Sequence, residues 1–303
     1  MPDGPSISPL SALMLLVLAV VWGGSFFFAE IALTEVSPLT VTLHRVLWAV
    51  PVLLVVVRAL GLRLPRAPRI WGAYLVMGAL NNAIPFSLIF WGQLAIESGL
   101  ASILNGMTAV FGAVAAGVLL RDEPLLARKV AGALLGLAGV AAILGPDLLG
   151  GLDPREAGQL AVLGAALSYA LASVWGKRVL SGQPPQVNAL GMLIGSSVLM
   201  VPVALWVDGV PRLDLSAHVW GALLCLSTVS TAMAYLLYFT ILGRAGAANL
   251  MLVTLIIPPF AAGLGAMFLG ERLGAEAWTG FALISAGLLV TDGRLLRRAR
   301  RRA

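Results

Sequence analysis

Apolar residues in this chain occur in long unbroken runs rather than on one face of a helix or at alternate positions of a strand. The runs 10–29, 100–120 and 130–146 contain no charged residue. A membrane-spanning helix needs ~20 mostly apolar residues, and only helices or closed barrels satisfy the backbone in lipid. A barrel would show ~10-residue segments of alternating polarity, and that alternation is absent. The pattern therefore predicts spanning helices.

Ten such spans fit the chain, so the predicted fold class is an all-α membrane protein with ten transmembrane helices. No Lys or Arg precedes the first run, and the run is longer than the ~7–15 apolar residues of a signal peptide. We therefore expect it to be a retained helix. The predicted spans are 10–31, 38–58, 70–94, 100–120, 130–147, 158–178, 187–207, 217–242, 248–269 and 277–292.

The distribution of Lys and Arg predicts the orientation. With a cytoplasmic N-terminus, sixteen of the twenty basic residues fall in inner loops or the C-terminal tail, and only Arg155, Arg212 and Arg272 fall outside. Cytoplasmic loops of membrane proteins carry this excess of positive charge. An even number of spans places both termini in the cytoplasm.

Composition agrees with this fold class and excludes others. Apolar residues make up 59% of the chain and charged residues 11%, whereas soluble domains are about half apolar and a quarter charged. The net charge of +6 lies in short loops and the tail, so we expect no nucleic-acid partner. Cys225 is the only cysteine and there are two histidines, so no cofactor and no metal site of Cys or paired-His type is expected.

Two stretches of the sequence match at an offset of 148 residues. An internal repeat predicts a first five-helix unit at 1–147 and a second at 148–303 with the basic tail. Because five is odd, the second unit is inverted, a recurrent plan of secondary transporters. The glycines allow close helix approach, so spans five and ten are expected to be scaffold. The matching residues are Glu123, Gly132 and Gly139 in the first unit and Glu271, Gly280 and Gly287 in the second.

Several of these features are shared with a known family. They are Trp22-Gly23-Gly24-Ser25-Phe26, Pro38 with His44-Arg45, the turn 242–249, and the two glutamate turns. The chain resembles the EamA family of the drug/metabolite transporter superfamily over essentially its whole length. It departs from the pattern where Glu271-Arg272 replaces the acidic residue and proline seen at Glu123-Pro124.

The resemblance implies a carrier in the bacterial inner (plasma) membrane that crosses it many times. Such a carrier exports amino acids or related amphipathic metabolites by alternating access through a central cavity. Its expected partners are a small-molecule substrate and the lipid bilayer, and it is expected to be a monomer, with a dimer as the alternative.

Polar and aromatic residues within the spans are candidates to line that cavity, because they are costly in lipid. The amides would bind a substrate ammonium or carboxylate, and the aromatics would form a wall around an amphipathic body. For each aromatic, helix packing or an interfacial belt is the alternative. The candidates are Trp22, Phe26, Asn81, Asn82, Phe86, Phe90, Asn105, Tyr169, Tyr235 and Tyr238.

Pro258 and Pro259 lie inside span nine. Proline removes a backbone donor and kinks or breaks a helix, and freed carbonyls are tolerated where they line a cavity. The pair is therefore either a gate or hinge, or a static kink.

Charged residues in the spans leave three questions open. Arg45 in span two is either part of a structural ion pair, with backbone carbonyls or Glu30 as partner, or a site for a substrate carboxylate. Glu30 and Lys177 occupy matching positions in the two units, and either guard opposite mouths or are snorkelling end residues. Apart from Asp147 and Asp292, the last residues of their spans, Glu30 is the only acid within a span. Proton or sodium coupling commonly uses an acid near the midplane, so uncoupled flux is expected.

Other function classes fit less well. A serine enzyme would need a serine and a histidine on facing helices, but of the two histidines His218 starts span eight at the outer surface, and no Gly-x-Ser-Gly motif is present. Paired membrane aspartates and a His-Glu-x-x-His motif are also absent, so we do not expect an enzyme. No phosphate-binding Walker loop is present, which excludes an ATP-driven pump. A channel is a weaker rival, since an inverted repeat favours a carrier. A flippase or transporter of a lipid-linked or nucleotide-linked sugar is the alternative.

Overall fold

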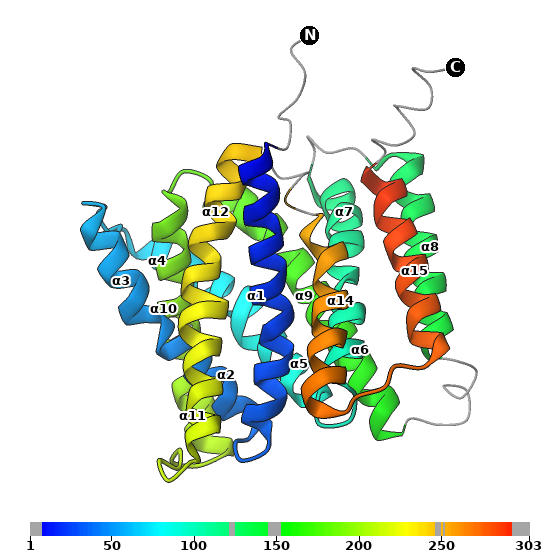
Figure 1. Ribbon diagram of the computed structural model, residues 1–303. Coiled ribbons are helices and arrows are strands. Elements are labelled where there is room, and N and C mark those ends of the chain that lie inside the picture. Colours follow the sequence, from blue (N-terminus) through cyan, green and yellow to red (C-terminus); the bar gives the residue numbers. More distant parts are fainter. Residues whose placement is uncertain (1–7, 121–124, 145–152, 246–249, 251, 293–303) are drawn as a thin grey trace.

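The structure is a computed structural model that describes residues 8–120, 125–144, 153–245, 250 and 252–292. Within these ranges every regular element is a helix, and the helices run up and down in one bundle (Figure 1). The elements are α1 (Pro9–Leu33), α2 (Pro38–Leu47), α3 (Ala49–Ala59), α4 (Pro68–Gly78), η1 (Ala79–Ala83), α5 (Ile84–Gly92), α6 (Ser98–Asn105), α7 (Met107–Leu119), α8 (Ala127–Leu144), α9 (Pro154–Val179), α10 (Pro185–Val207), α11 (Ala217–Leu224), η3 (Cys225–Met233), α12 (Ala234–Ala245), α14 (Val253–Leu264), η4 (Gly265–Leu269) and α15 (Ala275–Asp292).

Eight continuous or nearly continuous helical stretches are long and apolar enough to cross a membrane. They coincide with the first eight predicted spans. The last two predicted spans coincide with the shorter apolar stretches Val253–Leu269 and Ala275–Thr291, and the start of span nine lies outside the described residues. The first helix begins and the last helix ends on the same side of the bundle (Figure 1).

Two of the stretches are interrupted where a proline removes a hydrogen bond. The predicted straight span 38–58 consists of α2 and α3, which meet at Trp48. Pro51 has no N–H for the Leu47 carbonyl, which is where α2 ends. In the third stretch Pro85 likewise leaves the Asn81 carbonyl without its usual donor, and the wider π-helical turn η1 lies there. Such widened turns occur often at functional sites.

The α8 and α15 helices pack against each other through glycines. A Cβ added to Gly139 would lie 2.8 Å from the carbonyl oxygen of Gly280, and one added to Gly132 would overlap the carbonyl of Gly287. The two backbones therefore touch, and a methyl group on any of the four glycines has no space. We call this contact the glycine seam.

The contacts of the glycine seam are related by the repeat offset. Gly132 contacts Gly287, and Gly139 contacts Gly280. The offset of 148 relates Gly132 to Gly280 and Gly139 to Gly287, so it converts one contacting pair into the other. The same offset carries residues 79–83 of η1 onto 227–231, which lie inside the second π-helical segment, η3. This reciprocal pattern is what a two-fold relation between two halves produces.

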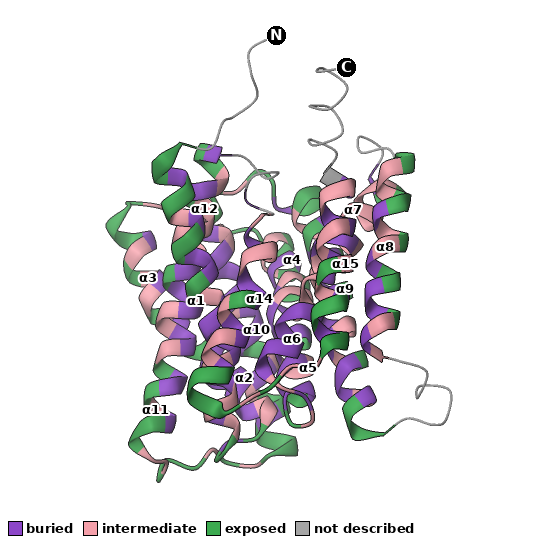
Figure 2. Ribbon diagram, turned by 45° about the vertical axis from the view of Figure 1, so that its right-hand side comes forward, coloured by how far each residue is buried: buried purple, intermediate pink, exposed green. Residues whose placement is uncertain are grey.

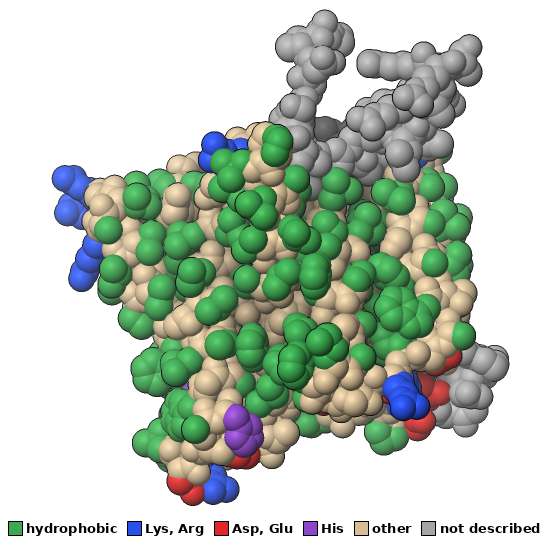
Figure 3. Space-filling model, viewed as in Figure 1, with side chains coloured by type: hydrophobic (Ala, Val, Ile, Leu, Met, Phe, Trp, Pro, Cys, Tyr) green, Lys and Arg blue, Asp and Glu red, His purple; other side chains and the backbone are tan. Residues whose placement is uncertain are grey.

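One hydrophobic core joins both halves, and the outer surface is apolar as well. The side chains of Leu53, Leu104, Leu193 and Leu226 are fully buried in it. Figure 2 shows buried positions concentrated inside the bundle and exposed positions on its outside. Figure 3 shows hydrophobic side chains covering the middle of the visible face, with acidic side chains at its lower edge. A belt of this kind is the surface that lipid covers.

Candidate functional site

Arg45 is the centre of a buried polar group in the bundle. It follows the start of α2 by seven residues, so it lies ~10 Å from that end of the helix. Its side chain is 7% exposed. Its Nε donates to the Thr231 hydroxyl at 3.0 Å, and its guanidinium carbon lies 3.8 Å from the ring centre of Phe86 and 5.7 Å from that of Phe90.

Thr231 can receive this bond because of the π-helical segment η3. The Thr231 hydroxyl donates to the carbonyl of Leu226, five residues earlier, at 2.8 Å. The hydroxyl proton is thus committed to the backbone, and the oxygen lone pairs face Arg45. Thr231 lies in the predicted span 217–242 but was not among the candidate lining residues. A threonine hydroxyl within a helix often bonds to its own backbone, so residue type and position alone do not mark it as a site residue.

Asn81, Asn82 and Tyr235 form a second part of the group. The Tyr235 hydroxyl donates to Oδ1 of Asn82 at 2.9 Å and accepts from Nδ2 of Asn81 at 3.2 Å. Nδ2 of Asn82 donates to the Ser196 hydroxyl at 3.2 Å. These bonds join η1 to α12 and α10, and each joins the first half of the chain to the second.

Aromatic rings complete the arrangement. Phe86 lies 6.2 Å from Phe90 and 6.4 Å from Tyr169 between ring centres. Tyr169 and Tyr235 are also the ionisable groups within electrostatic reach of Arg45. These side chains offer N–H and O–H donors and apolar ring faces, which suits a ligand with an anionic head and an apolar body. We call this set the central cluster: Arg45, Asn81, Asn82, Phe86, Phe90, Tyr169, Thr231 and Tyr235.

Trp22 and Tyr238 form a neighbouring ring pair. Their ring centres are 5.8 Å apart, and both side chains are half-buried. Tyr238 follows Tyr235 by one helical turn on α12 and interacts with it electrostatically. The structure therefore brings eight of the ten candidate lining residues into the central cluster or directly beside it.

Phe26 and Glu30 lie apart from the central cluster. The Gln93 side chain donates to the Phe26 carbonyl at 2.9 Å and to Glu30 Oε2 at 3.0 Å. Glu30, one of the partners considered for Arg45, is bonded to Gln93 near the C-terminal end of α1, and Arg45 is bonded to Thr231. Sequence reasoning missed Gln93, although an amide at the end of an apolar span was a usable signal.

Asn105 and Lys177 lie at the C-terminal ends of two other helices, α6 and α9. Asn105 ends α6 at the break before Gly106, and its Oδ1 is buried without a hydrogen-bond partner. Lys177 is exposed in the last turn of α9. Glu30 and Lys177 thus lie toward opposite faces of the bundle, as their matching positions predicted.

The two prolines of α14 differ from each other. Pro258 is buried and Pro259 is exposed, and α14 runs through both without a break. The helix is therefore continuous at the pair, and the choice between a hinge and a static kink stays a prediction. Gly23 of α1 packs against this segment, since a Cβ there would lie 2.9 Å from Phe260 Cβ and 3.1 Å from the Ile257 carbonyl oxygen.

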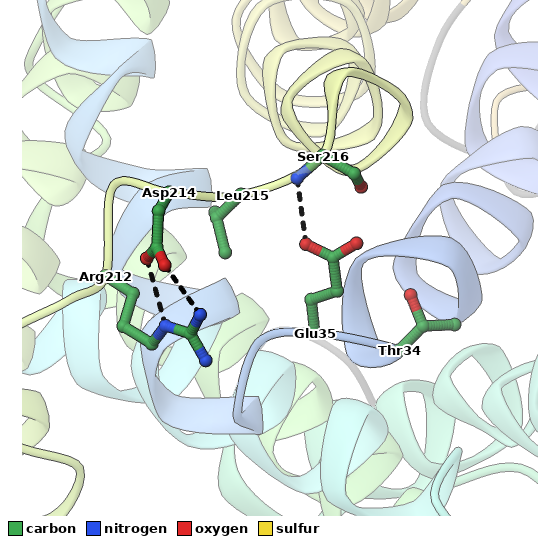
Figure 4. Close-up of a pocket in the computed structure, with 6 residues that line it drawn as sticks. All are labelled: Thr34, Glu35, Arg212, Asp214, Leu215 and Ser216. Atoms are coloured by element: carbon green, nitrogen blue, oxygen red, sulfur yellow. Dashed lines mark hydrogen bonds and ion pairs between the residues drawn. The ribbon is translucent and has the colours of Figure 1, made fainter.

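An open pocket is lined by Thr34, Glu35 and four residues of the segment 212–216, none of them a candidate site residue (Figure 4). Arg212 pairs with Asp214 through Nε at 3.0 Å and Nη2 at 2.7 Å, and the Ser216 backbone N–H donates to Glu35 at 2.9 Å. The hydrogen bonds from Ser216 lower the pKa of Glu35. The charged residues of the pocket already have partners and are exposed to solvent. The pocket is therefore a contact between two loops rather than a binding site.

Two carboxylates at the lower face of the bundle accept hydrogen bonds from the N-terminal residues of helices that are distant in the sequence. Glu271 accepts from the Ser98 backbone N–H and hydroxyl, both at 2.9 Å, and from the Gly99 N–H at 3.3 Å. Asp208 accepts from the Thr40 N–H at 3.0 Å and its hydroxyl at 2.8 Å, and from the Ser37 hydroxyl. The matching turn at Glu123 lies outside the described residues.

Comparison with known families gives one clear match. The sequence profile of the EamA-like transporter family matches residues 9–145 and again residues 156–291. The expectation drawn from the sequence motifs is thereby confirmed.

Individual relatives agree with this match. The chain is 29% identical to the uncharacterized transporter YvbV of Bacillus subtilis, over 93% of this chain and 91% of that protein. It is 26% identical to a probable amino-acid metabolite efflux pump of Escherichia coli, over 94% of this chain and 95% of the pump. A crystal structure at 19% identity superposes with a TM-score of 0.68 over 95% of this chain and 99% of the other, which supports the fold.

Proposed function

Because the chain belongs to the EamA-like transporter family, and is therefore a multi-pass membrane transporter rather than an enzyme, we propose that it exports small metabolites from the cytoplasm. The substrates are amino acids or related amphipathic compounds. They cross by alternating access through a central cavity at the central cluster. The name of the Escherichia coli relative, a probable amino-acid metabolite efflux pump, supports this substrate class.

The proposed architecture is ten spans in two inverted five-helix repeats, at 1–147 and 148–303. The reciprocal contacts of the glycine seam and the matching positions of η1 and η3 support it. The basic residues of the inner loops place both termini in the cytoplasm of a bacterial cell, in its inner membrane. One chain contains both halves of the path, so a monomer suffices.

The observation that carries the proposal is that both halves build the central cluster. Arg45, Asn82 and Phe86 come from the first half, and Tyr169, Thr231 and Tyr235 come from the second. A rocking motion of one half against the other changes the distances between these groups. Bonds such as those from Arg45 to Thr231 and from Tyr235 to Asn82 are therefore remade during each transport cycle.

Uncoupled flux follows from the charges of the site. Among the described residues no carboxylate contacts the central cluster, and Glu30 is held by Gln93. A protonatable acid at the midplane is the usual means of proton coupling. Without one, the substrate gradient alone drives transport. The ring pair Trp22–Tyr238 extends the cavity wall, and Pro258 acts as a hinge.

The test is flux of labelled amino acids and their derivatives in proteoliposomes that contain the full chain. Saturable flux without a pH gradient is the expected result, and Tyr235→Phe is expected to weaken it because the bond to Asn82 is lost. Cys225→Ser provides a matched control outside the cluster. Absence of flux for every compound, with lipid-linked sugar scrambled instead, would replace this proposal with the flippase alternative.

A further inference from the structure

The central cluster buries a permanent positive charge with no negative partner among the described residues. The contacts of Arg45 are the neutral Thr231 hydroxyl and the faces of Phe86 and Phe90, with two neutral tyrosines nearby. Glu30, in the last turn of α1, is bonded to Gln93. An unpaired buried charge is strongly unfavourable, so a group that neutralises it during the transport cycle is required.

We infer that this group is the carboxylate of the substrate, and that the carrier selects monocarboxylates with an apolar or aromatic body and without a free ammonium group. The inference rests on the proposed transport function and narrows its substrate class. It favours 2-hydroxy acids and N-acylated amino acids over the amino acids themselves.

One edge of the Arg45 guanidinium has no hydrogen-bond acceptor among the described residues. Thr231 occupies Nε only, and no described residue accepts a hydrogen bond from Nη1 or Nη2. The ring of Phe86 lies against the guanidinium carbon at 3.8 Å and covers a flat face, not the edge that carries the N–H groups. The guanidinium edge binds a carboxylate with two parallel hydrogen bonds.

The described residues of the central cluster offer no negative charge to an ammonium group. Asn82 is fully engaged, with Oδ1 bonded to Tyr235 and Nδ2 to Ser196. Asn81 presents one neutral amide oxygen, because its Nδ2 is already shared with Tyr235 and Asn82. An ammonium on the carbon beside the carboxylate would also lie within a few ångströms of Arg45, where two positive charges repel each other.

Ring faces do not remove this difficulty. A cation can bind over an aromatic ring, but the guanidinium of Arg45 already lies over Phe86 and near Phe90. A second cation there would share the same rings with a like charge. An apolar or aromatic body gains ring contacts without that repulsion.

The experiment compares 3-phenyllactate with phenylalanine in proteoliposomes of the full chain. The two compounds differ only in a hydroxyl or an ammonium on one carbon, and phenethylamine provides the form without a carboxylate. We expect kcat/KM for phenyllactate to exceed that for phenylalanine at least ~10-fold, as repulsion between two close charges predicts. Phenethylamine is expected to show no saturable flux.

Variants test the role assigned to Arg45. Arg45→Lys should keep the preference for the anion at reduced affinity, Arg45→Gln should abolish it, and Arg58→Gln on the exposed end of the same span should leave it unchanged. Equal or faster flux of phenylalanine would overturn the inference while the transport proposal stands. So would an undiminished preference in Arg45→Gln. No saturable flux of any compound would overturn the transport proposal and this inference with it.

Discussion

The glycine seam and the central cluster are held together by opposite means. In the seam, backbones touch because Gly132, Gly139, Gly280 and Gly287 have no side chains, and no polar side chain is needed. In the cluster, side chains from separate helices meet through polar atoms, and Arg45 is buried without a negative partner among the described residues. The seam packs backbone against backbone, whereas the cluster has hydrogen bonds that can exchange. We propose that the seam provides stability and that the cluster binds the substrate.

The strongest way to break this comparison is to add one methyl group to the seam. Gly139→Ala places a Cβ against the Gly280 carbonyl, 2.8 Å away, and overpacking of this kind costs about 3 kcal/mol or less. We expect a clear fall in thermal stability of the detergent-solubilised protein, with unchanged selectivity of the remaining flux.

Gly112→Ala is the matched control, since nothing lies within 4 Å of the added Cβ. It should stabilise slightly, because alanine is the better helix former. Equal melting temperatures for the two variants would show that the seam is not in close contact.

A second substitution tests the contribution of the lower face to stability, independently of transport. Glu271→Ala leaves three donors of Ser98 and Gly99 at the start of α6 without an acceptor. Loss of such a cap costs about 1–2 kcal/mol. Thermal denaturation should show this loss, and Glu276→Ala on the exposed first turn of α15 should not.

A third change addresses the cluster directly. Thr231→Val removes the acceptor of Arg45 Nε and the donor to the Leu226 carbonyl while keeping the shape of the side chain. One lost hydrogen bond of about 1 kcal/mol corresponds to a ~5-fold rise in KM. The control is Thr228→Val in the same segment, whose exposed hydroxyl bonds only to Leu224. A matching KM in both variants would remove Thr231 from the site.

The smallest expected effect concerns the two prolines. Pro258→Ala should slow the exchange between inward-open and outward-open forms by a few-fold, because a restored N–H stiffens α14. Pro259→Ala, at an exposed position, should change it less. Accessibility labelling at cysteines introduced on each face would measure the exchange. Equal rates for wild type and Pro258→Ala would show that the proline pair is a static kink rather than a hinge.

Sequence reasoning located the lining residues better than it located their partners. The aromatic and amide candidates were chosen because polar groups are costly in lipid, and Arg45, Asn82, Phe86 and Tyr235 do come together. The partner of Arg45 was left open between backbone carbonyls, Glu30 and a substrate carboxylate, and Thr231 was not among these alternatives. The actual acceptor, Thr231, is 186 residues away, and no local pattern reports such a contact.

The sequence by itself determined the helical fold class, the approximate spans and the bias of basic residues toward one side. It also determined the repeat, in which Gly132 and Gly280 occupy equivalent positions. These depend on properties that act locally: length of an apolar run, charge in a loop, and the spacing of small residues. Only the tertiary structure decided that α2 ends at Leu47, that Gln93 holds Glu30, and that Arg45 meets Thr231. Such contacts depend on the tilt and rotation of every helix at once. In lipid those are set by packing between helices, which a span's own composition does not contain.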